Sequence, residues 1–184
     1  DVRKPGQTLR DLSEAAMREV IGDRTVDEVI TIGRQDIEVS ALARMQDIVA
    51  RGFPYIVAEV DGAVAGYAYA NTYRTRVAYQ WTVENSVYVD AAFQGRGVGT
   101  TLLRSLIEAC TARGYRQMVA IIGGQETVAS IRLHEALGFK HIGVFPAVGF
   151  KFGRWVDTVL MQRALDPGSE TLPSVATPRA APGG

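Results

Sequence analysis

The sequence is poor in the residues that build redox or metal centres. It contains one cysteine, Cys110, and two histidines, His134 and His141. A single cysteine excludes an intrachain disulfide, and no Cys/His cluster has the spacing of a zinc site. Cys110 falls on the apolar stripe of a predicted helix, where a packed thiol is expected rather than a nucleophile. We therefore expect no metal and a reducing compartment, the cytoplasm.

An excess of one charge and long apolar runs are also absent. The 20 basic and 20 acidic side chains cancel to a formal net charge of zero, so neither a nucleic-acid partner nor an anionic membrane surface is indicated. No apolar run reaches the roughly 18 residues that span a bilayer. With 47% hydrophobic and 22% charged residues, the chain has the composition of an ordinary globular domain.

Periodicity predicts helices first and strands afterwards. Residues 9–52 have helical spacing, with a last helix over about 36–50 that ends at Gly52. Two short apolar runs, 55–60 and 63–70, flank Asp61-Gly62. This dipeptide is a strong hairpin signal because both turn positions need positive φ.

The remaining elements complete an α/β (α+β) pattern with one mixed sheet. Further strands are predicted at 81–89, 118–122, 141–145 and 155–165, and helices at 97–113 and 127–137. After Asp166 the chain turns to Pro, Gly, Ser, Thr and Ala. Such a composition buries too little apolar surface to pack, so 166–184 is predicted to be a disordered tail.

The most specific motif is the glycine-rich run Gln94-Gly95-Arg96-Gly97-Val98-Gly99. It lies between a strand that ends at Val89 and a helix that starts near Gly97. Glycines let the backbone approach an anion, and the helix N-terminus adds partial positive charge, so the run suits a pyrophosphate. The other interpretation is a turn that merely connects two elements. The run has neither the Gly-Lys-Ser/Thr of a Walker motif nor the third glycine of the dinucleotide fingerprint.

Several motifs in order resemble the Gcn5-related N-acetyltransferase (GNAT) family. Val87-Tyr88-Val89 and the glycine-rich run resemble its acetyl-CoA motif, and 130–139, ending in Leu-Gly-Phe, resembles its second signature. The stretches 82–89, 118–123 and 146–155 are similar to the phosphinothricin-acetyltransferase-like group in particular. The resemblance covers residues 38–165. It implies a GNAT domain whose mostly antiparallel mixed sheet, flanked by helices, splays at an acetyl-CoA slot.

The resemblance implies acetyl-CoA as the cosubstrate, without a metal. The implied cofactor-binding residues are Val87, Tyr88, Val89, Gln94, Gly95, Arg96, Gly97, Val98, Gly99, Thr100, Thr127 and Ser130. The backbone of Val87 and Val89 would bind the pantetheine arm, the loop from Gly95 to Thr100 would bind the pyrophosphate, and an N–H near Val87 could polarise the thioester carbonyl. Thr127 stands where the family usually has asparagine, so weaker cofactor binding is expected.

Two residues are candidates for proton transfer. Glu84 matches the family's glutamate, and a partly desolvated carboxylate there suits a general base. The alternative is an exposed strand glutamate in a salt bridge. His134 falls where many members place a tyrosine that protonates the departing thiolate, and the phosphinothricin-like group has histidine there. The alternative is a helix histidine packed against the sheet.

The acceptor is implied to be a small amino-acid-like amine with an acidic group. Arg74, Arg76 and Tyr79 match a basic loop of the group, and arginine suits bidentate binding of a carboxylate or phosphinate. The alternative is a solvated loop. Lys151 and Phe152 could form another wall of the site, although aromatic side chains there could equally serve the interface of a homodimer, which the group often forms.

The leading hypothesis is therefore an N-acetyltransferase that acts on phosphinothricin- or methionine sulfoximine-like amines, without nucleic-acid or membrane partners. The alternatives are acetylation of a protein N-terminus or another amine, a CoA-binding module with little or no turnover, and an interaction protein. Residues 1–37 depart from the family's usual beginning and resemble a stomatin/prohibitin-like segment. Because the family's usual beginning forms one wall of the acceptor site, this departure leaves the shape of the acceptor pocket unpredicted.

Overall fold

The computed structural model describes residues 34–123, 127–151 and 153–173 of the chain. Helices predicted before residue 34 and the tail after 173 lie outside these ranges. The described elements are α3 (Arg34–Ala50), β1 (Tyr55–Val60), β2 (Ala63–Thr72), η1 (Val77–Tyr79), β3 (Thr82–Val89), η2 (Ala91–Phe93), α4 (Val98–Ala112), β4 (Gln117–Gly123), α5 (Thr127–Ala136), β5 (Lys140–Lys151) and β6 (Arg154–Ala164). No helix in this part of the chain is long and apolar enough to cross a membrane.

The strands form one six-stranded sheet in the order β1-β2-β3-β4-β6-β5. Only β3 and β4 pair in parallel, so the predicted mixed, mostly antiparallel sheet is confirmed. Asp61 and Gly62 have φ angles of 48° and 79° and join β1 to β2, as the hairpin signal predicted. Strand β5 is longer than predicted. Its register shifts between Phe145 and Gly149, because Pro146 interrupts the pairing there.

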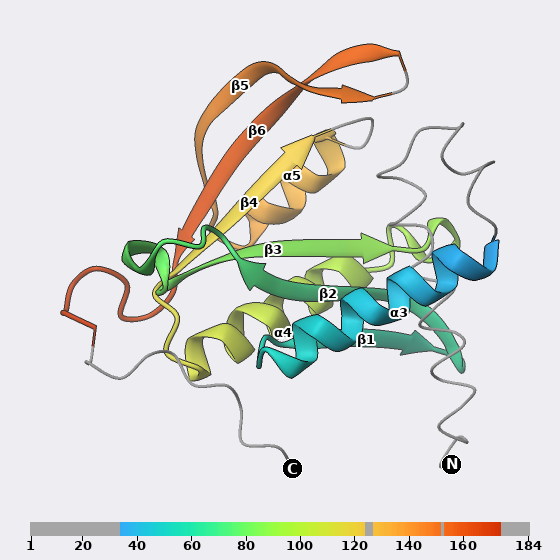
Figure 1. Ribbon diagram of the computed structural model, residues 1–184, viewed down its shortest axis with the longest axis horizontal. Helices are drawn as coiled ribbons and strands as arrows, with labels where there is room; N and C mark the ends of the chain where they lie inside the picture. The colour runs from blue at the N-terminus through green and yellow to red at the C-terminus, as the bar shows by residue number, and fades with distance from the viewer. Residues whose placement is uncertain (1–33, 124–126, 152, 174–184) are drawn as a thin grey trace.

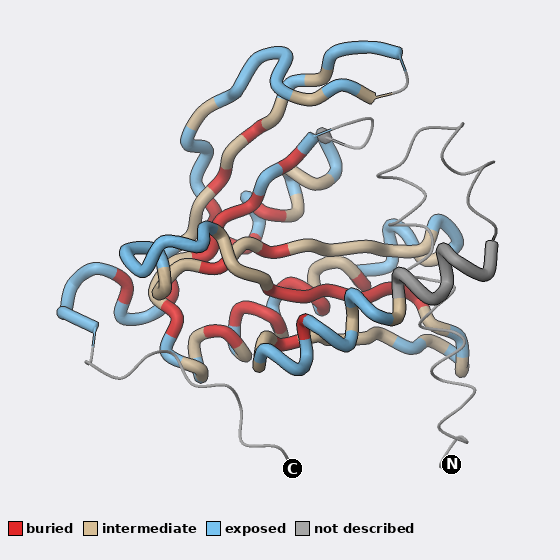
Figure 2. The backbone as a smooth tube through the Cα atoms, in the orientation of Figure 1, coloured by how far each residue is buried: buried red, intermediate tan, exposed pale blue. Residues whose placement is uncertain are grey.

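The two faces of the sheet are covered by different helices (Figure 1). Alternate residues of β2 point to opposite faces. Tyr67 and Tyr69 pack with Ile48 of α3, whereas Ala68 and Ala70 belong to the core that contains the apolar stripe of α4. Small side chains on that side of β2 allow α4 to lie close to the sheet. Figure 2 shows buried positions concentrated where β2 and α4 face each other.

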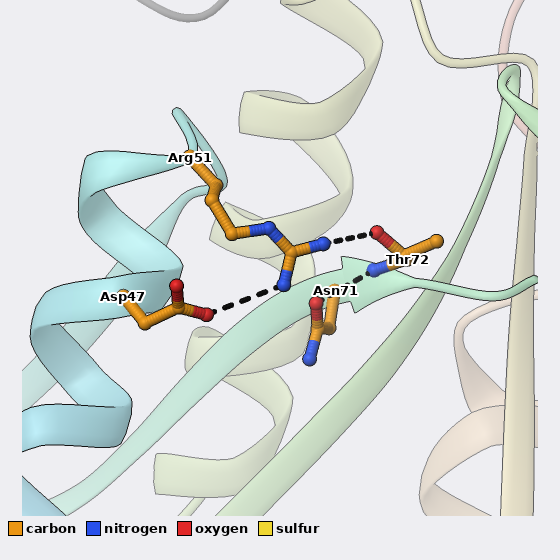
Figure 3. Close-up of polar contacts among 4 residues, drawn as sticks. All are labelled: Asp47, Arg51, Asn71 and Thr72. Atoms are coloured by element: carbon orange, nitrogen blue, oxygen red, sulfur yellow. Dashed lines mark hydrogen bonds and ion pairs between the residues drawn. The ribbon is translucent and has the colours of Figure 1, made fainter. Parts of the chain in front are cut away.

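The end of α3 is joined to the end of β2 by a short polar network (Figure 3). Arg51 donates to Asp47 Oδ2 at 3.3 Å and to the Thr72 hydroxyl oxygen, and the Thr72 backbone N–H donates to Asn71 Oδ1 at 2.8 Å. The two Arg51 contacts are exposed, so each contributes little to stability. They nevertheless fix α3 beside Asn71, which pairs with Glu84 of β3.

Arg116 contacts the chain that follows β6. Its guanidinium donates to Thr171 Oγ1 at 3.0 Å and to the Leu172 carbonyl oxygen at 3.2 Å. Leu165 is buried in the main core. The described residues of the predicted tail therefore lie beside Arg116, just before β4. Disorder of residues 174–184 stays a prediction.

Candidate active site

The sheet forks between β3 and β4. The parallel pairing runs from Thr82 opposite Gln117 to Asn85 opposite Ala120 and then stops. Beyond this point β3 continues to Val89 beside β2, while β4 continues beside β6. Figure 1 shows the two strands diverging. Backbone groups on the open edge of β3 therefore have no strand partner and are available to a ligand that lies in the fork.

A cavity of about 1210 Å³ lies at the fork and reaches both faces of the sheet. On the face covered by α5 it is lined by Asn85, Ala120 and His134. On the face covered by α3 it is lined by Glu84, Tyr67 and Tyr88 among others. Strand alternation produces this arrangement, since Glu84 and Asn85 are neighbours on β3 and point in opposite directions. Two molecules could thus approach one point from opposite sides.

The glycine-rich loop and α4 begin directly after one wall of this cavity. Gln94 lines the cavity, and Gly95 and Gly97 have φ angles of 73° and 81°. Gly97 caps α4 without a side chain, so the N–H groups of the first helical turn are not occupied by a capping side chain. A Cβ at Gly99 would lie 3.3 Å from Leu133 of α5. Glycine there lets α4 and α5 approach each other.

The other implied cofactor residues divide into those that line the cavity and those that do not. Val87, Tyr88, Val89 and Ser130 line it. Arg96 packs over the ring of Phe93, 5.6 Å from its centroid. Thr127 is the first residue of α5, and Val98 and Thr100 lie in the first turn of α4, directly after the loop.

Glu84 is half-buried on β3, beside the fork. Burial raises the pKa of its carboxyl above the ordinary value, because the charged form loses hydration. Among the described residues no ion pair is recorded for Glu84, so the alternative of a salt-bridged surface glutamate is not favoured. A carboxylate with a raised pKa is a stronger base than a free one, which suits proton removal from an amine.

His134 is only 3% exposed and lies in a polar network with Asn85. Its Nδ1 lies 2.7 Å from the Ser130 carbonyl oxygen, one turn earlier in α5, and its Nε2 lies 3.0 Å from Asn85 Oδ1. Asn85 Nδ2 donates to the carbonyl oxygen of Val119 at 3.1 Å. The ring of Phe139 packs edge-on against His134 at 4.8 Å. Burial lowers the pKa of His134, and the hydrogen bond to Ser130 partly offsets this.

Asn85 was not among the residues predicted from the sequence. A signal for it was present, since alternation places it on the face of Val83, Val87 and Val89, where it is the single polar residue. A polar side chain on an otherwise apolar strand face needs a buried partner. The partner, His134, is distant in the sequence and could not be identified from the strand alone.

The basic loop does not line the cavity at the fork. Arg74, Arg76 and Tyr79 line a separate cavity of about 280 Å³, next to Thr82 at the start of β3. Lys151 is half-buried at the end of β5 and does not line either cavity. Phe152 lies outside the described residues. Within the described ranges, no cluster of three or more His, Cys, Asp or Glu side chains could hold a metal ion.

A mixed sheet that forks beside a glycine-rich loop and a helix N-terminus defines a GNAT-type acyl-CoA fold. The chain belongs to the acetyltransferase (GNAT) family, whose sequence pattern matches residues 12–139. This match begins inside the segment 1–37 that resembled a stomatin/prohibitin-like protein, and none of the matches supports that second likeness.

Individual relatives are consistent with the family. The chain is 52% identical over 131 residues to a phosphinothricin N-acetyltransferase of Alcaligenes faecalis, which covers 71% of this chain and 66% of that protein. It is 47% identical over 115 residues to an L-methionine sulfoximine/L-methionine sulfone acetyltransferase of Salmonella typhimurium, covering 62% and 67%. The chain thus spans just under two thirds of the first of these proteins.

A solved structure agrees over nearly the whole chain. It is that of a GNAT phosphinothricin acetyltransferase from Sinorhizobium meliloti in complex with AcCoA. Its TM-score to this chain is 0.81 at 39% sequence identity, with 98% of this chain and 95% of that one covered.

Proposed function

We propose that this protein is an N-acetyltransferase that transfers the acetyl group of acetyl-CoA to the amine of a small amino-acid-like acceptor. The acceptor class is that of phosphinothricin and methionine sulfoximine, on which the relatives described above act by name. The observation that carries the proposal is the cavity at the fork, which exposes a half-buried carboxylate on one face and a buried imidazole on the other.

Acetyl-CoA fits the fork as a cosubstrate. The unpaired edge of β3 offers backbone groups of Val87 and Val89 to the amide groups of pantetheine, in the manner of a missing strand. The glycine-rich loop and the side-chain-free N-cap at Gly97 offer N–H groups to the pyrophosphate. Tyr88, Thr127 and Ser130 complete this proposed binding surface.

Glu84 and His134 divide the proton transfers between them. The acceptor ammonium must lose one proton before attack, and its nitrogen loses a second one from the tetrahedral adduct. Glu84 receives a proton directly or through water, and His134 returns one to the CoA thiolate as the C–S bond breaks. One proton per turnover is released to solvent. A backbone N–H near Val87 stabilises the developing oxyanion.

The acceptor's acidic group is assigned to cationic side chains of the loop and of β5. Arg74 and Arg76 provide bidentate donors, and Tyr79 lines the same cavity as the two arginines. Lys151 and Phe152 are proposed as a further wall of the acceptor site. The loop residues line a different cavity from Glu84. The direct test of their contribution is to substitute Arg74 and measure KM for the acceptor.

A homodimer is part of the proposal. Hairpin β5–β6 extends from the sheet (Figure 1) and exposes large apolar side chains. These are Ile142, Val144, Phe145, Val148, Phe150 and Trp155. Apolar side chains gathered on one hairpin favour burial against a second copy. Light scattering of the purified protein and of a Phe150→Glu variant distinguishes a dimer from a monomer. We also propose a cytoplasmic location, where the cosubstrate acetyl-CoA is available.

The test is acceptor-dependent release of free thiol from acetyl-CoA. Cys110 does not disturb this assay, because it is fully buried and its pKa is raised to about 12. Wild-type protein should release thiol with phosphinothricin or methionine sulfoximine, and Glu84→Gln should lower kcat about 10²- to 10⁴-fold.

Glu59→Gln is the matched control, since Glu59 is an exposed glutamate on β1. It should retain full activity, and both variants should keep the affinity for acetyl-CoA. Thermal stabilisation by acetyl-CoA without thiol release for any amine would instead indicate a CoA-binding module.

A further inference from the structure

Asn85 occupies the last paired position before the sheet forks. It lies opposite Ala120 in the parallel register, and no pair follows it. Asn85 and His134 are the buried polar side chains in the described part of the chain, 7% and 3% exposed. The amide of Asn85 reaches across the fork to the Val119 carbonyl oxygen and outward to His134. One side chain therefore joins β3, β4 and α5 at the point where the cavity begins.

The hydrogen bonds of this network impose a condition on the protons. Both ends are backbone carbonyl oxygens, of Ser130 and of Val119, and a carbonyl oxygen only accepts. Asn85 must turn its NH₂ toward Val119, so its Oδ1 faces Nε2 of His134. Nδ1 faces the Ser130 oxygen. All three contacts are satisfied only when both ring nitrogens carry a proton.

Turning the amide of Asn85 over does not remove this condition. The flipped amide would donate to a neutral Nε2, but its oxygen would then face the Val119 carbonyl oxygen at 3.1 Å. Two acceptors would oppose each other in a buried site, which is unfavourable. A neutral His134 therefore always leaves one contact unsatisfied.

We propose that Asn85 is a positioning residue that holds the His134 ring at the fork and increases the share of the protein in which Nε2 of His134 carries a proton. This inference rests on the role of His134 in the proposed function. When His134 gives its Nε2 proton to the thiolate, the hydrogen bond from Nε2 to Asn85 Oδ1 is lost and two acceptors then face each other. This mismatch favours the return of a proton from solvent to Nε2. In this proposal Asn85 acts through His134.

Other titratable groups near α5 do not explain the protonation of His134 that we assign to Asn85. Helix α5 contacts β4, which carries no titratable side chain, and the start of β5, where Lys140 and His141 are exposed. On α5 itself Arg132 and Glu135 are exposed. Glu84 points to the opposite face of the sheet. Burial disfavours the protonated form of His134. Asn85 Oδ1 accepts from the protonated ring and so partly offsets this effect.

The experiment is an NMR titration of the imidazole signals, for which this chain is well suited because it has only two histidines. Exposed His141 is the internal reference and is assigned by a His141→Gln variant. Asn85→Leu removes the acceptor at similar volume and should lower the His134 midpoint by about one to two pH units. Asn85→Asp keeps an acceptor, adds a charge, and should raise the midpoint by about one to three units.

Gln162→Leu is the matched control. It removes another amide bridge between neighbouring strands, from Gln162 Nε2 to Gln117 Oε1 at 2.8 Å, without touching His134. Its His134 midpoint should equal that of the wild type. In turnover assays Asn85→Leu should lower kcat about tenfold or more at neutral pH, with KM for acetyl-CoA unchanged, and Asn85→Asp should recover part of kcat and shift the pH profile upward.

The outcomes separate this inference from the proposed function. A His134 midpoint that is the same in the wild type, Asn85→Leu and Asn85→Asp overturns the positioning role, even if turnover depends on Glu84. Midpoints that move as expected support it, even if no tested amine is acetylated. If Asn85→Leu does not fold, Asn85→Asp decides: an unchanged midpoint there refutes the inference.

Discussion

Gly66 gives the most direct test of the fork, because a single methyl group there reaches the cavity wall. Gly66 lies on β2 opposite Val89. A Cβ at this position would lie 2.4 Å from the Tyr88 carbonyl oxygen, 3.1 Å from Leu102 Cδ1 and 3.2 Å from Val89 Cα. Real Cβ contacts are essentially never under 3.0 Å, so the backbone of β3 must move by at least 0.6 Å.

The movement is directed toward the cavity. Leu102 is only 1% exposed in the core under α4 and has no space to withdraw. The strain therefore falls on β3 at Tyr88 and Val89, whose open edge is the proposed pantetheine surface. Overpacking of this kind costs about 1–3 kcal/mol, which lowers Tm by about 2–12 °C in a chain of this size. A displacement approaching 1 Å lowers turnover by about 10- to 100-fold.

The assay compares Gly66→Ala with Gly143→Ala. A Cβ at Gly143, on β5, meets no atom within 4 Å, so this control should change Tm by no more than about 2 °C and leave turnover intact. Gly66→Ala should also raise the acetyl-CoA concentration needed for thermal stabilisation. If the two variants melt and turn over alike, the close approach of β2 and β3 at the fork is wrong.

Two further predictions follow from the loop and from His134. Gly97→Ala should destabilise the chain by about 1 kcal/mol, because φ is 81°, and should weaken acetyl-CoA binding. Gly153→Ala, with φ of 71° in the β5–β6 turn, should show the same destabilisation with normal binding. The pKa of His134 is lowered from 6.5 in the folded chain. Its contribution to stability is therefore complete above the unfolded pKa and declines as the pH falls below 6.5. Urea unfolding between pH 5 and 8 should show this decline, and a His134→Gln variant should show less of it.

Local signals accounted for the elements of the fold. Asp61-Gly62 predicted its hairpin because the turn conformation depends on those two residues alone. The glycine-rich loop predicted the start of α4 to within a residue, since Val98 is its first residue. The length of β5 was underestimated, because a strand that continues past Pro146 depends on its pairing with β6 and leaves no regular alternation in the sequence.

Contacts across the sheet were harder to predict from the sequence. Glu84 and His134 could be selected as a pair only through the family resemblance, and the sequence did not indicate that they occupy opposite faces. Asn85 was missed because its significance depends on α5, which follows much later in the chain. Arg74 and Arg76 were expected near the acceptor, but the distance between the loop and the cavity depends on where β2 ends and β3 begins, and this is a property of the folded sheet.

The fork explains why adjacent residues of one strand can serve different steps. In a continuous sheet, Glu84 and Asn85 would face separate environments and never act on the same molecule. Where the pairing with β4 ends, the two faces are connected through the gap, and the cavity touches both side chains. In the proposed mechanism, the carboxylate on one face and the buried imidazole on the other act at opposite ends of the same bond exchange without neutralising each other. If β3 and β4 stayed paired for one more residue beyond Asn85, the two faces should no longer be connected beside Glu84 and His134. The position at which the pairing ends, Asn85, therefore determines the site.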